Sequence, residues 1–486
     1  MAPLLAVTVA MVLADSAVVT LALPDILQHL NATVGQVAWV LIAYNVVLAV
    51  AAVPAAALLK LGRPEVLSAI GIAAFAGSSA ACAAAGSIEV LLIARCVQAL
   101  GGALALIGCL VLLVVDRGER RGLATWITAG VIGTAIGPVV GGLLTQAISW
   151  QAIFVVQVPF AALAVPAAMY RSTHPRSPAR RPATADGREG ADEVTGSLHH
   201  RPALRANLTQ ALLSAALTAA LFLLVLLLVE GWKHSPATAA LTVSVVPIAA
   251  LCAAPLARLF STPHHVEVAV GCFLIAGGLA GLAIPPSSHL GWTIAPQALV
   301  GLGLGLTVDR LTTMAMEARL PQATHAGWTI AARHIGVVVG LAILTPVFTA
   351  DLADAEDPAQ QAITALVLDA PLRPQAKIAV AQALGDELNA QHGQVPDLSS
   401  AFAGLDVDPD ERAATDALER DLTDQLERAA TLAFRDSFLI GAGLALLALL
   451  AALTHPRSPA RRPATADGRG GAGEDPGLLD PERSDS

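Results

Sequence analysis

The chain has 486 residues, of which 55% are hydrophobic and 14% charged, and its mean hydropathy is +0.65. This composition is too apolar for a soluble globular protein of this size and predicts a membrane protein. The five cysteines all lie within apolar segments, which argues against a disulfide framework or a zinc site. The formal net charge of −9 becomes informative only when it is divided among the loops. We expect no nucleic-acid partner.

Twelve continuous apolar runs follow one another along the chain, each long enough to cross a bilayer as a helix of about 20 residues. They are rich in Ala and Leu and lack the short length and alternation of strands. The runs lie near residues 3–23, 34–59, 65–86, 88–115, 122–147, 149–170, 204–229, 235–260, 266–285, 291–316, 322–349 and 430–453. The first run ends without an Ala-x-Ala cleavage signal, so we interpret it as a retained span. The sequence therefore predicts an all-α membrane protein with twelve transmembrane helices in two halves of six.

The predicted halves cover residues 1–170 and 204–453. A linker rich in Pro, Arg and Ser, 171–203, connects them, and a disordered tail, 454–486, follows the second half. Basic residues gather in the loops after alternate spans and in the linker: Lys60, Arg63, Arg117, Arg120, Arg121, Arg171, Arg176, Arg180, Arg181, Arg258 and Arg319. Because Lys and Arg mark the cytoplasmic side, we expect both termini in the cytoplasm and a multi-pass protein in the cell membrane.

One stretch occurs twice, at 173–188 and 454–469, each time directly after the last span of a half. Two interpretations stand: a repeated docking or lipid-contacting tail, or a recent copying event with no separate function.

The loop 350–429 holds seventeen acidic and five basic residues, a net charge of −12, and is placed outside the membrane. Within it, 375–391 carries Ile378, Ala381, Leu384 and Leu388 at helical spacing, and 410–430 carries Ala414, Leu418, Leu422 and Leu426. We expect a small external helical insertion with a solvated acidic surface. Binding of a partner or recruitment of cationic compounds is the alternative.

Two charged residues are predicted to meet inside the membrane. Asp15 lies roughly 18 Å from the cytoplasmic face on the first span, and Arg95 lies near 19 Å on the fourth. Ionisable groups in lipid are costly and usually face a partner or a cavity. An Asp15–Arg95 ion pair would suit a proton-coupled site, whereas a fixed structural pair joining two helices is the alternative.

Other polar residues sit at depths where they can line a central cavity. Arg333, next to His334 near the middle of the eleventh span, can contact an anionic group or water, whereas Asp309 and Arg310 lie near a span end, where snorkelling or a local pair is expected. The candidate cavity residues are Tyr44, Asn45, Gln98, Gln297 and Arg333. Each alone also fits an interhelical hydrogen bond.

Glycines at 133, 137 and 141 form a bare stripe on the predicted fifth span, and Pro138 and Gly142 interrupt its apolar residues. Small residues four apart let another helix approach closely, and Pro138 removes a backbone donor and favours a bend. Two interpretations of this stretch stand: a joint at which parts of the protein move against each other, or an ordinary face for helix packing.

No catalytic motif is present: the chain has no Walker loop, no HExxH, no GxSxG and no paired metal ligands. We therefore expect no enzyme activity, no metal and no cofactor.

Several segments, in the expected order along the chain, resemble the major facilitator superfamily, in particular its drug:proton antiporters related to the fourteen-span multidrug exporters. The matching segments begin at Asp15 in the first span, at Trp39 with Tyr44 and Pro54 in the second, at Arg95 in the fourth, at Gly133 in the fifth, at Trp150 in the sixth, and at Gly301 and Arg333 in the second half. The stretch from Gly133 to Gly142 fits the family's antiporter motif at every defining position. Two departures stand out. The loop after the second span has Leu59 where the family has a gating aspartate and Ala55 where it has a glycine, and the two extra central spans are absent.

The resemblance implies a proton-coupled exporter of small amphipathic or hydrophobic compounds that works by alternating access as a monomer. Asp15 would be the protonated carboxylate, Arg95 its partner, and the glycine stretch a seal where the two halves close on the external side. Alternatives are an exporter of lipid or cell-envelope precursors that uses the external loop, and a non-transporting membrane sensor or scaffold.

Overall fold

A computed structural model of the chain describes residues 1–30, 32–170, 203–260, 263–285, 288–316, 319, 321–390, 398, 402 and 410–453. The described residues form helices and short connections, and twelve of the helical segments are long and apolar enough to cross a membrane. The predicted all-α fold with twelve spans is confirmed. Residues 171–202 of the linker, the tail 454–486 and both copies of the repeated stretch lie outside the described residues.

The N-terminal half contains six spans. They are α1 (Ala2–Thr20), α3 (Val34–Leu61), α4 (Pro64–Ala83), α5 (Ile88–Arg117), α6 (Glu119–Ala147), and α7 (Ala152–Val155) followed by α8 (Gln157–Met169), with the short α2 (Leu23–His29) between the first two. The starts of these helices are encoded locally. Thr33 forms a capping box with Gln36 at the start of α3, and Ser87 caps α5. Gly118, at φ +81°, allows the sharp break between α5 and α6.

The C-terminal half repeats this plan with more interruptions. Its spans are α10 (Leu204–Thr218) continued by η2 (Ala219–Leu223), α11 (Leu224–Leu226) and η3 (Leu227–Gly231); α12 (Pro236–Val243) with α13 (Val245–Phe260); α14 (His264–Leu282); α15 (Gly291–Met316); α16 (Gln322–Asp369); and α19 (Arg412–Leu453). The seventh span therefore contains two π-helical stretches. Such wide turns are rare in helices and are frequent at functional sites.

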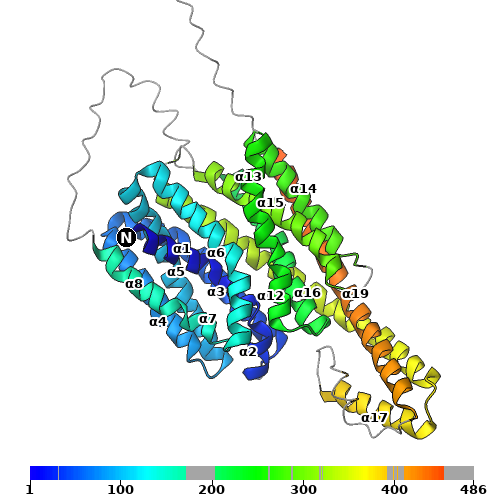
Figure 1. The fold of residues 1–486 in the computed structure, drawn as a ribbon. Coiled ribbons are helices and arrows are strands. Elements are labelled where there is room, and N and C mark those ends of the chain that lie inside the picture. The colour runs from blue at the N-terminus through cyan, green and yellow to red at the C-terminus, as the bar shows by residue number, and fades with distance from the viewer. Residues whose placement is uncertain are drawn as a thin grey trace, which may run out of the picture.

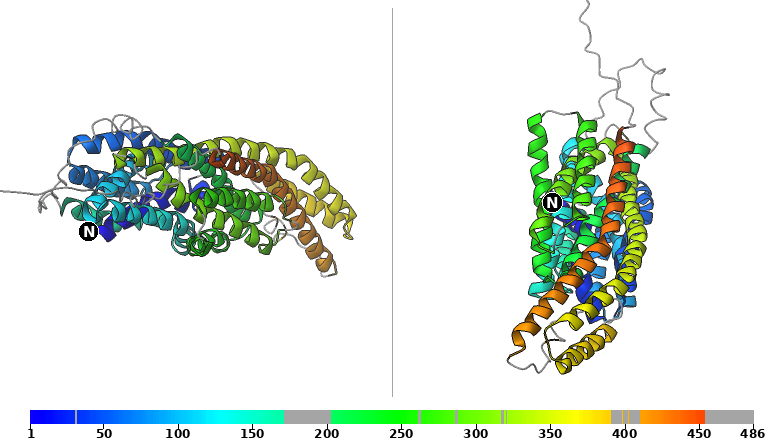
Figure 2. Two further views of the ribbon diagram at one scale, coloured as in Figure 1. Left: turned by 90° about the horizontal axis from the view of Figure 1, so that it is seen from above. Right: turned by 90° about the vertical axis from the view of Figure 1, so that its right-hand side faces the viewer.

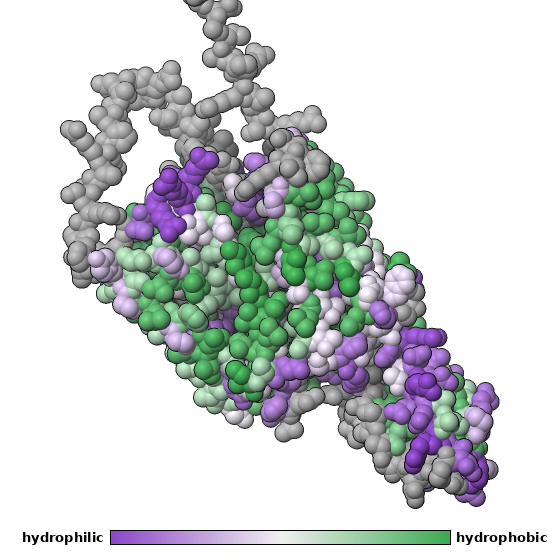
Figure 3. Space-filling model, in the orientation of Figure 1, coloured by the Kyte–Doolittle hydropathy of each residue, from purple (hydrophilic) through white to green (hydrophobic). Residues whose placement is uncertain are grey.

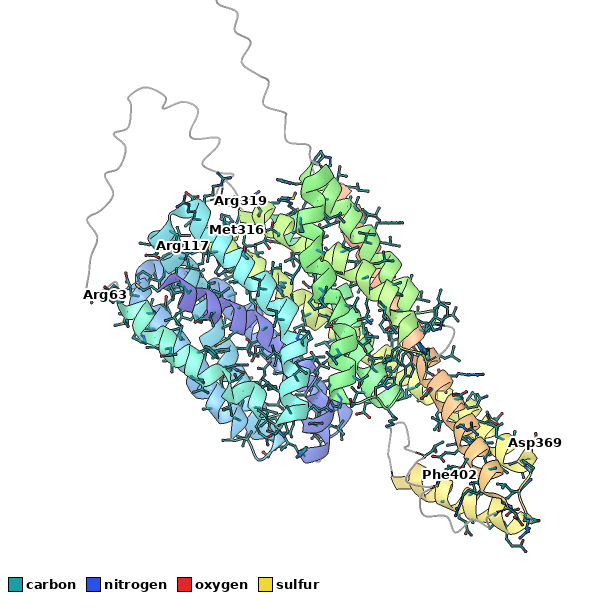
Figure 4. All side chains as sticks on the ribbon, in the orientation of Figure 1. Arg63, Arg117, Met316, Arg319, Asp369 and Phe402 are labelled. Carbon is teal, nitrogen blue, oxygen red and sulfur yellow. The ribbon has the colours of Figure 1, made fainter. Side chains whose placement is uncertain are left out.

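The two halves lie side by side, the N-terminal half in blue and cyan and the C-terminal half mainly in green (Figures 1 and 2). Arg63, Arg117 and Arg319 mark one end of the bundle, which we call the basic end (Figure 4). Buried apolar side chains form two clusters. One gathers around Ala103 and Ala326 towards the basic end, and the other gathers around Leu21 and Phe434 towards the opposite end. Each cluster contains residues of both halves.

The face of the bundle seen in Figure 3 is mostly apolar, and hydrophilic residues gather at its ends and on the part that projects from it. Large side chains such as Val50, Ile93 and Leu450 are 70%, 67% and 58% exposed on the spans. In water this exposure would be unfavourable, whereas in a bilayer the lipid covers it.

The described residues of the acidic loop form a helical extension beyond the bundle, with Asp369 near its tip (Figure 4). The last two spans do not end where their apolar runs end: α16 continues to Asp369, and α19 begins at Arg412. Together with α17 (Pro374–Ala390) they enclose a separate apolar core. Ala is the commonest residue in the continuation of α16, with six of the twenty residues 350–369, and Ala favours helix whether or not lipid surrounds it.

One of the two predicted apolar faces in this extension is correct. Leu418 and Leu422 are buried, with Ala414 and Leu426 packed against the same core. On α17, Leu384 is buried as predicted, but Ile378 and Ala381 are exposed, and Val380 is buried in their place with Ala376 beside it. The prediction was wrong because Ala376, Val380 and Leu384 also recur every four residues, so spacing alone does not choose between the two faces. The side chain of Leu388 lies outside the described set.

Candidate functional site

A buried polar cluster lies inside the N-terminal half. Asp15 of α1 and Arg95 of α5 are both fully buried and form a direct ion pair. Gln157 of α8 donates from Nε2 to Asp15 Oδ1 at 2.8 Å, and Gln98 of α5 donates to the same oxygen at 3.3 Å. The structure thus brings together the two charges that the sequence places at matching depth.

The amide side chains link this ion pair to a fourth helix. Gln98 Oε1 accepts a hydrogen bond from Arg95 Nη1 at 2.6 Å, and Gln98 Nε2 donates to Ser79 Oγ on α4 at 2.8 Å. Ser79 in turn donates to Gln157 Oε1 at 3.1 Å. A buried ion pair is tolerated only when further hydrogen bonds satisfy its remaining groups, and these amides supply them for Asp15.

Tyr44 of α3 completes the cluster. The guanidinium carbon of Arg95 lies 4.0 Å from the centroid of the Tyr44 ring, a cation–π contact. The Tyr44 hydroxyl donates to the backbone oxygen of Val12 at 3.1 Å, which holds the ring against α1. Arg95 Nε and Nη2 have no hydrogen-bond partner among the described residues. The guanidinium is therefore held by Asp15, by Gln98 and by the ring of Tyr44.

A cavity of about 380 Å³ lies between the two halves. Helices α1, α3 and α6 line one side, and α10, α13, α15 and α16 line the other. Its polar wall includes Ser16, Asn45, Thr134, Gln210, Ser214 and Arg333. The volume falls in the range of small-molecule sites.

Two hydrogen bonds cross this cavity from α16 to the N-terminal half. Arg333 donates from Nη2 to Thr134 Oγ1 on α6 at 2.8 Å. His334 Nδ1 and Asn45 Oδ1 on α3 share a hydrogen bond of 2.6 Å, and Asn45 itself donates to Leu41 O. Arg333 and His334 are adjacent on α16, and each thus binds a different helix of the N-terminal half.

The halves also touch on both sides of the cavity. At the basic end, Gln322 of α16 donates to Glu119 of α6 at 2.7 Å, and Gly327 packs on the backbone of Ala52. At the opposite end, the backbone N–H of Ala237 donates to Gln146 at 2.5 Å. The family's gating aspartate is replaced here by Leu59, which is buried in the apolar cluster of the basic end.

The candidate cavity residues divide into two groups. Asn45 and Arg333 line the cavity. Tyr44 and Gln98 belong instead to the polar cluster, because each faces Asp15 or Arg95. Gln297 is fully buried and donates to Thr293 one turn earlier on α15. Gln297 therefore makes its hydrogen bond within its own helix and does not line the cavity, while its Oε1 has no hydrogen-bond partner among the described residues.

Sequence reasoning missed three contributors. Ser79 lies in a stretch of Ala and Ser with no feature that sets it apart. Gln157 could have been found, because a polar residue in an apolar span is itself a signal. Asp309 also lines the cavity. It forms the expected local pair with Arg310 at 4.0 Å, and Arg310 pairs more closely with Glu267 of α14, at 2.5 Å.

The glycine stripe packs within one half. A Cβ on Gly133, Gly137 or Gly141 would meet the backbone oxygens of α1 residues four apart, at Ala10, Ala14 and Val18 respectively. The prediction that this stripe closes the two halves against each other is therefore wrong for these glycines, because α1 of the same half occupies their bare face. Only Gly142 faces the other half, where a Cβ would meet Ala240 of α12. Helix α6 is continuous through Pro138.

The chain matches the family model described as Major Facilitator Superfamily over residues 5–343. It is 37% identical over 176 residues to the tetracenomycin C resistance and export protein of Streptomyces glaucescens, which covers 35% of this chain and 32% of that protein. It is 34% identical over 157 residues to the multidrug resistance protein Stp of Mycobacterium tuberculosis, covering 32% and 29%. The matched segment therefore spans about a third of the length of these relatives.

A solved structure shares the fold across almost the whole chain. The crystal structure of a bacterial homolog of the human lysosomal transporter Spinster, inward-facing and unoccupied, has a TM-score of 0.60 and 15% identity. The alignment covers 94% of this chain and 98% of that one. At this identity the likeness concerns the fold alone.

Proposed function

Because the chain belongs to the Major Facilitator Superfamily, we propose that it is a proton-coupled secondary transporter that exports small amphipathic or hydrophobic compounds. The resistance exporters that match its sequence support export of drug-like or natural-product cargo. The observation that carries the proposal is the buried Asp15–Arg95 pair beside a cavity between the two halves.

In the proposed cycle, protonation of Asp15 removes the negative charge that Arg95 needs. The ion pair then weakens, and Arg95, whose other nitrogens have no partner among the described residues, has to find new contacts. Helices α1 and α5 carry these two residues, so their packing changes with the proton. Helix α1 also contributes Ser16 and Thr20 to the cavity wall, which connects the proton site to the cargo site.

Alternating access follows from the contacts at the two ends of the cavity. The pair Gln322–Glu119 would break when the basic end opens, and the pair Ala237–Gln146 would break when the opposite end opens. We place the basic end in the cytoplasm, with both termini, because Lys and Arg favour that side of the cell membrane. Each proton that moves inward then contributes about 2.3 kcal/mol per 100 mV of membrane potential.

Reconstituted full-length protein tests the proposal. We expect an imposed pH gradient to drive transport of a fluorescent cargo into or out of proteoliposomes, and Asp15→Asn to abolish that dependence. Asp25→Asn is the matched control, because it makes the same change on the short helix α2, away from the cluster. Equal transport by Asp15→Asn, with no effect of collapsing the gradient, would refute proton coupling.

A second candidate function is export of lipid or cell-envelope precursors. It is favoured by the helical extension, which has its own apolar core and stands beyond the bundle where it can receive cargo. Removal of the extension distinguishes the two functions, because only the second requires it.

A further inference from the structure

The cavity wall carries one arginine without an acidic partner. Arg333 makes its hydrogen bond with the neutral hydroxyl of Thr134 at 2.8 Å. None of the ion pairs found among the described residues includes it. Yet the guanidinium lies in a cavity whose wall is mostly apolar, with Leu13, Ile127 and Leu341 among the lining residues. An arginine in such an apolar cavity is stabilised by any anion that can reach it and form hydrogen bonds with it.

The other charges close to the cavity leave Arg333 uncompensated. The carboxylate of Asp15 is occupied by Arg95, and neither residue lines the cavity. Arg310 pairs with Glu267 at 2.5 Å and with Asp309 at 4.0 Å, so two carboxylates share one cation. Asp309 does line the cavity, but its side chain is 52% exposed. It lies about 10 Å along α15 from the basic end, whereas Arg333 lies about 16 Å along α16 from that end. The deeper part of the cavity is therefore positive and the part nearer the basic end is negative.

The groups around Arg333 suit a bound anion. Thr134, Asn45 and His334 are neutral or hydrogen-bonding side chains on the same part of the wall, and none brings a competing carboxylate. A guanidinium offers two parallel N–H donors that match a carboxylate, which makes arginine a selective partner for acids. The apolar remainder of the wall matches a hydrophobic body.

We propose that the cargo is an amphipathic organic acid. Its carboxylate or phenolate pairs with Arg333, and its aromatic or alicyclic part lies on the apolar wall. The inference rests on the proposed export function, because it takes the cavity to be the cargo site. It concerns binding, however, and can be tested without transport. Cationic amphiphiles are disfavoured in the deeper part of the cavity because Arg333 repels them.

A pair of dyes with one skeleton and opposite charge provides the test. Fluorescein methyl ester carries a phenolate at mildly alkaline pH, and rhodamine 123 carries a cation on the same ring system. We expect purified full-length protein in detergent, with no gradient, to bind fluorescein methyl ester more tightly, as measured by fluorescence anisotropy. Arg333→Gln should weaken binding of that anion about tenfold, the usual loss for one hydrogen bond to a charged group, and leave rhodamine 123 binding unchanged or tighter.

Two further variants separate charge from folding. Arg333→Lys keeps the charge and should preserve the preference for the anion, and Arg435→Gln makes the same chemical change at an exposed position on α19 and should alter neither dye. If Arg333→Gln does not fold, competition on the wild type decides: naphthoate should displace fluorescein methyl ester, and the uncharged naphthamide should not. Tighter binding of rhodamine 123 by the wild type, equal displacement by both naphthalene compounds, or equal loss of both dyes in a folded Arg333→Gln variant would overturn the proposal.

The outcome separates this inference from the proposed function. A preference for the anion that depends on Arg333, combined with no proton-driven movement in proteoliposomes, would sustain the inference and refute export. Proton-driven movement combined with tighter binding of the cation would support export and refute the inference.

Discussion

Replacement of Gly133 by alanine is the sharpest test of how the N-terminal half is packed. A Cβ at Gly133 would lie against the backbone oxygen, carbonyl carbon and Cα of Ala10. These are backbone atoms of α1, so no side chain can turn aside, and α1 and α6 must separate. Forcing an extra methyl group into such a contact costs about 1 to 3 kcal/mol, and the better helix propensity of alanine recovers only about 0.5 to 1 kcal/mol of this.

The chain provides matched controls. A Cβ on Gly77 of α4 or Gly443 of α19 would meet nothing within 4 Å. Gly77→Ala and Gly443→Ala should therefore be neutral or slightly stabilising, by about 0.5 to 1 kcal/mol. Reversible unfolding by SDS in mixed micelles, followed by tryptophan fluorescence, measures all three variants on one scale. If Gly133→Ala is as stable as the two controls, the close contact between α1 and α6 does not exist as described.

Two further results are expected. Arg95→Met should destabilise the protein by about 3 to 5 kcal/mol because it leaves the buried Asp15 carboxylate without its cation. Adding Asp15→Asn should recover most of that loss, and equal stability of Arg95→Met and wild type in the same SDS assay would contradict the ion pair. Replacement of residues 351–429 by a short Gly-Ser linker should leave the bundle folded and dye transport intact, since the extension has its own core. A folded protein that no longer transports would favour export of lipid or envelope precursors instead.

Much of the fold could be predicted because lipid imposes simple rules. Twelve apolar runs gave twelve spans, and the depth of Asp15 and Arg95 along two oppositely directed helices was enough to predict their meeting. The ends of α16 and α19 could not be predicted in the same way. An apolar run marks where lipid covers a helix, but helix propensity decides where the helix stops, and α16 runs on to Asp369.

The candidate site shows where depth alone is insufficient. Tyr44 and Asn45 are adjacent in sequence and lie at the same depth, yet Tyr44 covers Arg95 and Asn45 lines the cavity. Neighbours on a helix point about 100° apart, so the face that each residue presents depends on how the helix is rotated about its axis. That rotation is set by packing between helices, for instance by Gly133 and Gly141 against α1. A stripe of glycines indicates close packing but does not identify the partner helix.

The same packing recurs in the second half, where a Cβ on Gly336 or Gly340 of α16 would meet the backbone of Ala211 or Ala215 on α10. The fifth and eleventh spans thus hold the first and seventh spans in the same way. Transporters with internal repeats work by rocking one repeat against the other. Rigid pairs α1–α6 and α10–α16 would let each half move as one body.

The length of α16 has a mechanical consequence. This helix carries Arg333 and His334 at the cavity and is continuous to Asp369 at the tip of the extension, a distance of about 50 Å at 1.5 Å per residue. If it moves as a rigid rod about the cavity, a tilt of about 10° displaces the tip by about 9 Å. The extension would then amplify the movement at the cavity, and an optical label near Asp369 would report, from the aqueous phase, which way the cavity faces.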